Sequence, residues 1–121
     1  MIRSRFSAAV LSAAAFISLS GCHSYHIDTT IENRSGGVVK LLEVDYPFAS
    51  FGTDSIAAGA DYHYRFQVEG SGPLTIEYTT ANGHAAKATG PNLAQGQEGR
   101  LQIVLLPEAK VEFQPELRPK S

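Results

Sequence analysis

Imidazole side chains give this chain its clearest capacity for metal chemistry. The chain contains four histidines, His23, His26, His63 and His84, and imidazole is the commonest protein ligand of transition metals. No CxxC or HExxH motif accompanies them, so their spacing does not match a compact metal site. We therefore expect exposed strand histidines and no cofactor, with His63 and His84 as weak candidate ligands.

His63 has an aromatic neighbour on each side, Tyr62 and Tyr64. This arrangement could line a ligand groove with aromatic walls. The alternative is a strand in which both tyrosines point into the core and His63 points into water. The second interpretation is favoured because residues 61–69 alternate without interruption between polar and apolar side chains.

Motifs for nucleophilic catalysis and phosphate binding are missing from the sequence. No GxSxG, GxGxxG or Walker-type loop occurs. The glycine-containing segment 90–99 joins two expected strands, so it offers phosphate no helix N-terminus. We expect the domain not to be an enzyme.

Three aromatic residues, Tyr46, Phe48 and Phe51, lie in a segment that also contains Pro, Gly and Ser. Exposed aromatic side chains on irregular segments often mark sites for partner proteins. We expect either a surface for another protein here or an aromatic cap over the open end of a core.

Cys22 is the single cysteine of the chain, so no internal disulfide can form. The residues before it begin with a basic segment containing Arg3 and Arg5 and continue as an apolar stretch of small and aliphatic residues from Ser7 to Leu19. A bilayer span needs about 20 apolar residues, more than this stretch provides. Residues 1–21 therefore predict a cleaved export signal.

The segment Leu19-Ser20-Gly21-Cys22 resembles the lipobox of bacterial lipoproteins. This resemblance implies cleavage between Gly21 and Cys22 and attachment of diacylglycerol to the Cys22 thiol, usually with an amide-linked acyl chain. Each buried methylene contributes about 0.8 kcal/mol, so two or three chains would form a permanent anchor. The body of the chain is similar to small uncharacterised β-sandwich lipoproteins, which supply no functional residues.

Lipoprotein sorting, as known from enterobacteria, retains proteins with Asp after the cysteine in the inner membrane. This chain has His23 at that position. The resemblance therefore favours the outer membrane, with the domain facing the periplasm or the cell exterior.

The charge balance excludes some partners. The full chain has a formal net charge of −2, and the basic residues Arg3 and Arg5 lie in the expected signal, so the exported part is more acidic still. An acidic domain gains nothing from counterion release on nucleic acid and is repelled by anionic headgroups. We expect no nucleic-acid partner and membrane attachment only through the lipid.

Alternation with period two recurs along the chain and predicts half-buried strands. The expected strands are residues 25–33, 38–46, 61–69, 74–80, 84–89, 100–106 and 110–114, with a short edge strand that ends at Ile56. Their positions predict a bulge near Leu41, inward-facing Tyr64 and a two-residue hairpin turn at Asn82-Gly83. Residues 90–99 are expected to be a loop, and 100–106, the most apolar strand, to be central.

No stretch of the body shows helical periodicity, and turns recur every 8 to 12 residues. This spacing predicts an all-β fold, an antiparallel immunoglobulin-like or transthyretin-like β-sandwich of about seven or eight strands. The expected organisation is a signal at 1–21, a lipidated tether at 22–24, a β-sandwich at 25–114 and a flexible tail at 115–121. At roughly 3.5 Å per residue the tether spans only about 10 Å.

Overall fold

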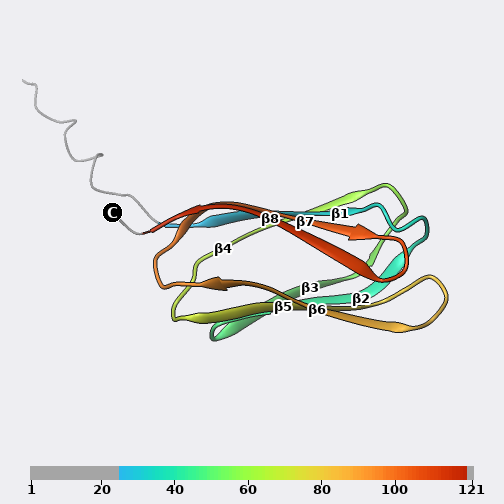
Figure 1. Ribbon diagram of the computed structural model, residues 1–121, viewed down its shortest axis with the longest axis horizontal. Coiled ribbons are helices and arrows are strands. Elements are labelled where there is room, and N and C mark those ends of the chain that lie inside the picture. The colour runs from blue at the N-terminus through green and yellow to red at the C-terminus, as the bar shows by residue number, and fades with distance from the viewer. Residues whose placement is uncertain (1–24, 120–121) are drawn as a thin grey trace, which may run out of the picture.

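The computed structural model describes residues 25–119, which form an all-β sandwich of eight strands in two sheets (Figure 1). The expected signal, Cys22 and His23 lie outside the described residues. The strands are β1 (Ile27–Asn33), β2 (Val39–Tyr46), β3 (Ala49–Ile56), β4 (Asp61–Phe66), β5 (Gly72–Thr79), β6 (Ala85–Leu93), β7 (Glu98–Leu106) and β8 (Lys110–Arg118).

Each sheet has four strands, in the orders β4-β1-β7-β8 and β3-β2-β5-β6. The expectation of a wholly antiparallel fold is wrong at one place, because β1 and β7 pair in parallel, with Ile27 beside Gly99 and Asn33 beside Leu105. The long connection that returns the chain to β7 makes this parallel pairing possible. β7 is an inner strand, as its apolar sequence predicts.

Alternation places the core as expected in β1. Ile27, Thr29, Ile31 and Asn33 are all buried, because side chains two residues apart share one face of a strand. The sheets pack through a single core that both contribute to. Its fully or nearly fully buried members include Val39, Leu42, Val44, Leu74, Ile76, Leu101, Ile103 and Leu105.

The bulge expected near Leu41 is present in β2. The register between β2 and β5 shifts between Lys40 and Glu43, and Leu41 adopts a positive φ of 51°. The shift lets Val39 and Leu42 both face the core although they are three residues apart, while Leu41 is 67% exposed. A two-against-one pairing of this kind is a β-bulge.

Residues 115–118 are not a tail. They continue β8 as far as Arg118, which pairs with Glu98 of β7. Pro115 is tolerated because β8 is an edge strand, where a missing N–H need not break a ladder. Leu117 also packs against the core, so this end of the strand has an apolar contact as well.

The expected loop at 90–99 is also shorter in the structure. β6 continues through Pro91 to Leu93, which is only 2% exposed, and β7 already begins at Glu98. The register between β5 and β6 shifts between Pro73 and Thr75, which leaves one extra residue on β6. Pro91 therefore lies at a bulge of an edge strand.

The β5–β6 hairpin has the predicted pairing, with Thr79 opposite Ala85, but its turn is longer than two residues. The Thr80 N–H donates to the His84 carbonyl at 2.8 Å, and the Gly83 N–H donates to the Thr80 carbonyl at 2.9 Å. Only Gly83 of the turn residues has a positive φ, 86°. One left-handed glycine after a type I turn gives a three-residue loop.

The strand directions give the sandwich two ends (Figure 1). We call the end where β1 begins the entry end and the opposite one the far end. The entry end carries the connections 47–48, 67–71 and 94–97, and the far end carries 34–38, 57–60, 80–84 and 107–109.

Candidate functional site

The three aromatic residues expected to form a partner surface have different environments. Phe51 is 7% exposed and Tyr46 is half-buried against the core, whereas Phe48 is 86% exposed. The prediction of one shared surface is therefore wrong for Phe51 and Tyr46, whose strand positions turn them inward. Both side chains pack with the core instead.

Phe51 and Tyr64 close the open side of the sandwich between β3 and β4. Their rings stack at a centroid distance of 4.2 Å, and they come from different sheets. Tyr64 therefore faces the opposite sheet, as expected, but it is 39% exposed rather than buried. β4 is an edge strand, and an inward-facing side chain on an edge has the core on only one side.

Phe48 lies in the β2–β3 turn, with a positive φ of 70°. Its ring covers Gly70 so closely that a Cβ there would overlap the ring. The contact joins the β2–β3 turn to the connection between β4 and β5. Phe48 is thus held in place on one side while most of its ring faces solvent.

A hollow of about 390 Å³ lies at the far end. Three connections, 34–38, 80–84 and 107–109, line it with the polar side chains of Ser35, Asn82, His84 and Glu108, and the buried Tyr78 of β5 also lines it. Its size lies in the range of small-molecule sites. Residues far apart in the sequence meet at this hollow, since Ser35 and Ala109 are separated by more than half of the described chain.

Tyr78, which lines this hollow, has a buried hydroxyl that is unpaired within residues 25–119. Its side chain is only 3% exposed, and its buried hydroxyl has no hydrogen-bond partner among the described residues. Burial raises the pKa of the Tyr78 phenol, so the hydroxyl stays protonated and is able to donate. An unpaired buried hydroxyl costs about 1–3 kcal/mol.

Tight turns surround the hollow. Glu108 and Ala109 connect β7 to β8 with φ values of 65° and 59°, a left-handed conformation that glycine or asparagine usually adopts. A Cβ on Gly37 would come within 2.6 Å of the Ala81 side chain, so the 34–38 and 80–84 connections pack directly on each other.

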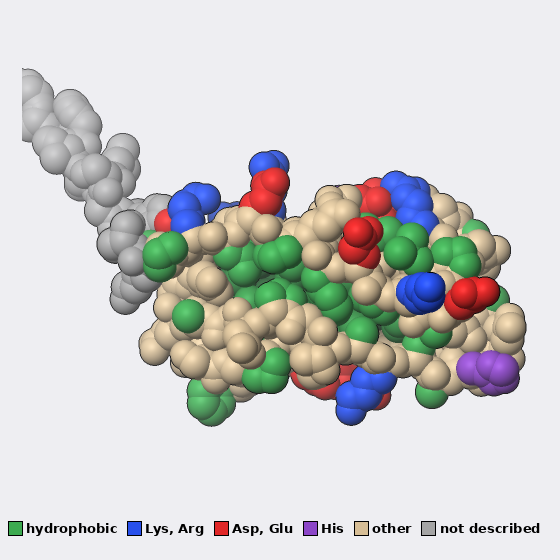
Figure 2. Space-filling view, in the orientation of Figure 1, with side chains coloured by type: hydrophobic (Ala, Val, Ile, Leu, Met, Phe, Trp, Pro, Cys, Tyr) green, Lys and Arg blue, Asp and Glu red, His purple; other side chains and the backbone are tan. Residues whose placement is uncertain are grey.

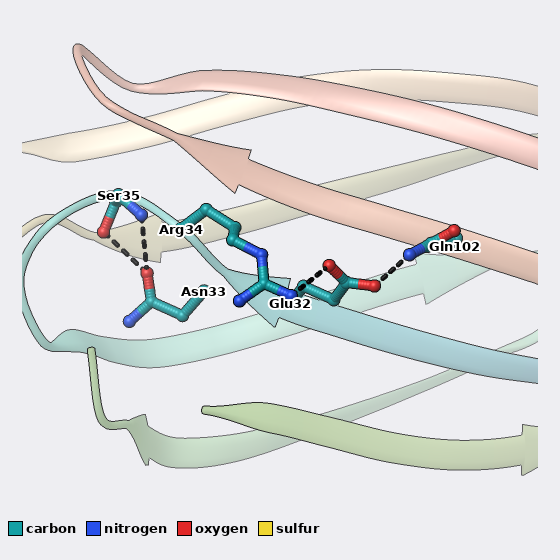
Figure 3. A network of polar contacts seen from close by, with 5 residues as sticks. All are labelled: Glu32, Asn33, Arg34, Ser35 and Gln102. Atoms are coloured by element: carbon teal, nitrogen blue, oxygen red, sulfur yellow. Dashed lines mark hydrogen bonds and ion pairs between the residues drawn. The ribbon is translucent and has the colours of Figure 1, made fainter. Parts of the chain in front are cut away.

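Asn33 holds the 34–38 connection in place. Its side-chain amide donates to the carbonyls of Gly37 (2.8 Å), Ile56 (2.9 Å) and Ala57 (3.1 Å). Its Oδ1 accepts from the N–H and the hydroxyl of Ser35 (Figure 3). Asn33 is fully buried, so one side chain ties two neighbouring far-end connections together.

A second polar chain lies beside it (Figure 3). Arg34 forms an ion pair of 2.8 Å with Glu32, and the Gln102 amide donates to the other carboxylate oxygen of Glu32. These contacts hold the Arg34 side chain against Glu32 on the outer face of β1.

His63 and His84 lie apart in the part of the chain that the structure describes. His63 on β4 contacts the Thr30 hydroxyl at 3.1 Å, and His84 lines the far-end hollow. Within residues 25–119 no group of three or more His, Cys, Asp or Glu side chains is placed to hold a metal ion. The structure therefore puts the two candidate ligands in separate surroundings.

Sequence reasoning missed the far-end hollow. The sequence predicts Tyr78 only as a core residue, and Ser35 and Asn82 only as turn residues. The sequence does show polar side chains concentrated in turns, and an antiparallel topology brings alternate turns to one end. Which turns become neighbours depends on the strand order, and alternation does not predict the strand order.

Comparison with known proteins gives the fold alone. No protein-family model matches the chain, and no curated protein matches it. Among solved structures, an NMR structure of a protein from Eubacterium rectale is similar, with a TM-score of 0.54 and 16% sequence identity over 79% of this chain and 90% of that chain. Residues 25–119 contain no helix that is long and apolar enough to cross a membrane.

Proposed function

We propose that this chain is a bacterial lipoprotein, anchored by lipid on Cys22, whose β-sandwich is a non-catalytic binding domain that presents its far end to a partner. The observation that carries the proposal is the placement of the hollow. β1 starts at the entry end, a few residues after Cys22, and the hollow lies at the opposite end.

The length of the sandwich gives this arrangement its meaning. β7 has nine residues, and at about 3.3 Å per residue it spans about 30 Å. A lipid at the entry end would therefore leave the hollow about one domain length from the membrane. A site in that position is open to another envelope protein, and the lipobox at residues 19–22 supports the anchor.

We further propose that the sandwich is transthyretin-like rather than immunoglobulin-like. An immunoglobulin sandwich places its first two strands side by side in one sheet. Here β1 and β2 belong to different sheets. The strand order therefore favours the transthyretin-like alternative.

We propose the outer membrane as the location, with the domain facing the periplasm or the cell exterior. The residue after Cys22 is His23 rather than Asp, which is the feature that favours this location.

A small ligand is the second candidate occupant. The hollow is lined by Tyr78, His84 and Glu108, and converging polar residues in a concave site are typical of ligand binding. Native mass spectrometry of the protein isolated from its host would detect such a ligand, and His84→Ala should reduce its occupancy.

Site-specific photocrosslinking in intact host cells tests the proposed binding face. A photoreactive amino acid at Asn82, on the hollow, should capture one reproducible envelope component, and the same group at the exposed Ser50, near the entry end of β3, should not. Crosslinking of the partner from position 82 should decrease when the same chain also carries His84→Ala. Equal capture from both positions would overturn the far end as the binding face.

A further inference from the structure

We propose that Phe48 contacts the lipid headgroup region of the membrane and orients the domain on its anchor. The inference rests on the lipid anchor of the proposed function and adds a second contact with the membrane. It is carried by the conformation of the β2–β3 turn, the composition of the entry end and the place where the described chain begins.

Two features of Phe48 are unfavourable in the isolated domain, its exposure to water and its backbone conformation. Its side chain is 86% exposed, and its φ of 70° is one that a residue with a Cβ rarely adopts. Pro47 and Phe48 are the two central residues of the β2–β3 turn. When proline is the first central residue and the second has a positive φ, the second is usually glycine. In the isolated domain one side of the ring packs on Gly70 and the rest faces water, so an apolar partner would bury surface that the fold leaves exposed.

The surroundings of Phe48 fit a lipid interface better than a charged surface. The entry-end connections 47–48, 67–71 and 94–97 contain a single charged side chain, Glu69. Their other residues are Gly, Ser, Gln, Ala, Val, Pro and Phe. Amphipathic and uncharged polar groups of this kind are tolerated at the headgroup level, where aromatic rings are enriched.

The location of the anchor decides which partner Phe48 meets. The described chain begins at Tyr25 at the entry end, three residues after Cys22, and the β2–β3 turn lies at the same end (Figure 1). Hydrophobic side chains project at this end of the surface (Figure 2). A tether of about 10 Å keeps the entry end within reach of the bilayer.

Tryptophan fluorescence tests the contact, because the chain has no tryptophan of its own. The F48W variant of residues 22–121 is coupled through the Cys22 thiol to maleimide lipid in phosphatidylcholine vesicles with or without brominated acyl chains. A ring at the headgroup and acyl boundary should show about twofold quenching by bromine and a blue-shifted emission.

Leu41→Trp is the matched control. Leu41 is also an exposed hydrophobic residue with a positive φ, but it lies toward the far end of β2. The inference predicts no quenching for this variant. Equal quenching of the two variants, or quenching of neither, would overturn it.

A second measurement needs no substitution. Coupling of the wild-type chain to the same vesicles should slow hydrogen exchange at residues 48–50 and leave residues 81–84 unchanged. A blue shift of F48W that grows with protein concentration in the absence of vesicles would assign Phe48 to a second copy of the chain and would overturn the membrane contact.

The coupling supplies an anchor whether or not the cell lipidates Cys22. Missing acylation in cells would therefore remove the proposed function without changing the vesicle result. An unquenched F48W variant would remove this inference and leave the anchor in place.

Discussion

Asn33 shows at the scale of one residue how the far end is held together. Its side chain uses both amide hydrogens and its oxygen in the contacts with Gly37, Ile56, Ala57 and Ser35. The sequence predicts a turn after Asn33, since Asn, Ser and Gly are typical turn residues. It does not predict that Asn33 faces the core, or that its amide reaches the β3–β4 connection.

Replacement of Asn33 by alanine should therefore lower the free energy of unfolding by about 2–4 kcal/mol, because several buried polar groups lose their partners at once. Urea denaturation measures the loss. The matched control is Asn92→Ala on the exposed face of β6, which should stay within about 0.5 kcal/mol of the wild type. Similar losses for both variants would contradict the role of the Asn33 network.

Tyr78 and Thr29 both bury a hydroxyl that has no partner among the described residues. Tyr78→Phe and Thr29→Val should each leave stability unchanged or raise it by up to about 2 kcal/mol, since both remove an uncompensated polar group. Thermal and urea denaturation provide the values.

The two variants should differ in binding. Only Tyr78 lines the far-end hollow, so Tyr78→Phe should weaken capture from Asn82 and Thr29→Val should not. A marked loss of stability in Tyr78→Phe would mean that its hydroxyl contributes a native hydrogen bond and is not free to donate to a ligand.

At the scale of the element, β2 is the strand whose alternation breaks and whose outer face carries like charges. The bulge at Leu41 was predictable, because no single register places Val39, Leu42 and Val44 together. The pairing of Glu43 with Glu77 across the sheet was not, because cross-strand neighbours depend on strand order.

Glu43 should make stability depend on pH. Its hydrogen bond with Asp45 raises the pKa of Glu43, and the charge of Asp45, burial and the charge of Glu77 act in the same direction. The folded state therefore binds a proton more readily than the unfolded state. The destabilisation from Glu43 is present at neutral pH and is relieved as pH falls through the raised pKa.

Glu43→Gln should thus be more stable than the wild type at pH 7, and the difference should shrink toward pH 4. Denaturation midpoints across this range measure it. In an Asp45→Asn background the gain should become smaller, because the main cause has been removed. A gain that is independent of pH would point to a cause other than charge.

In the other strands, too, some features could be predicted from the sequence and others depended on the strand order. Alternation predicted where most strands lie, because it reports which face is buried. It misplaced the ends of β6 and β8, where Pro91 and Pro115 resemble strand breaks in the sequence. Edge strands accept proline, and whether a strand is at an edge is a property of the sheet.

At the scale of the whole molecule, the topology separates the two surfaces to which we assign roles. The aromatic stack between β3 and β4 covers one open side of the core, and Phe113 of β8 covers Gly90 of β6 on the other. In the side view, hydrophobic side chains form a band between the sheets (Figure 2). Packing thus covers both open sides of the core, and the proposed anchor and the proposed binding face lie at the two ends.

The central claim is the lipid anchor, because the orientation of both ends follows from it. Host cells that express the tagged protein are fed an alkyne fatty acid, and the wild type is compared with Cys22→Ser. We predict an acyl-labelled mature chain that begins at Cys22, and for the variant an unlabelled and unprocessed precursor. A processed wild-type protein without lipid would contradict the claim and indicate an ordinary cleaved signal.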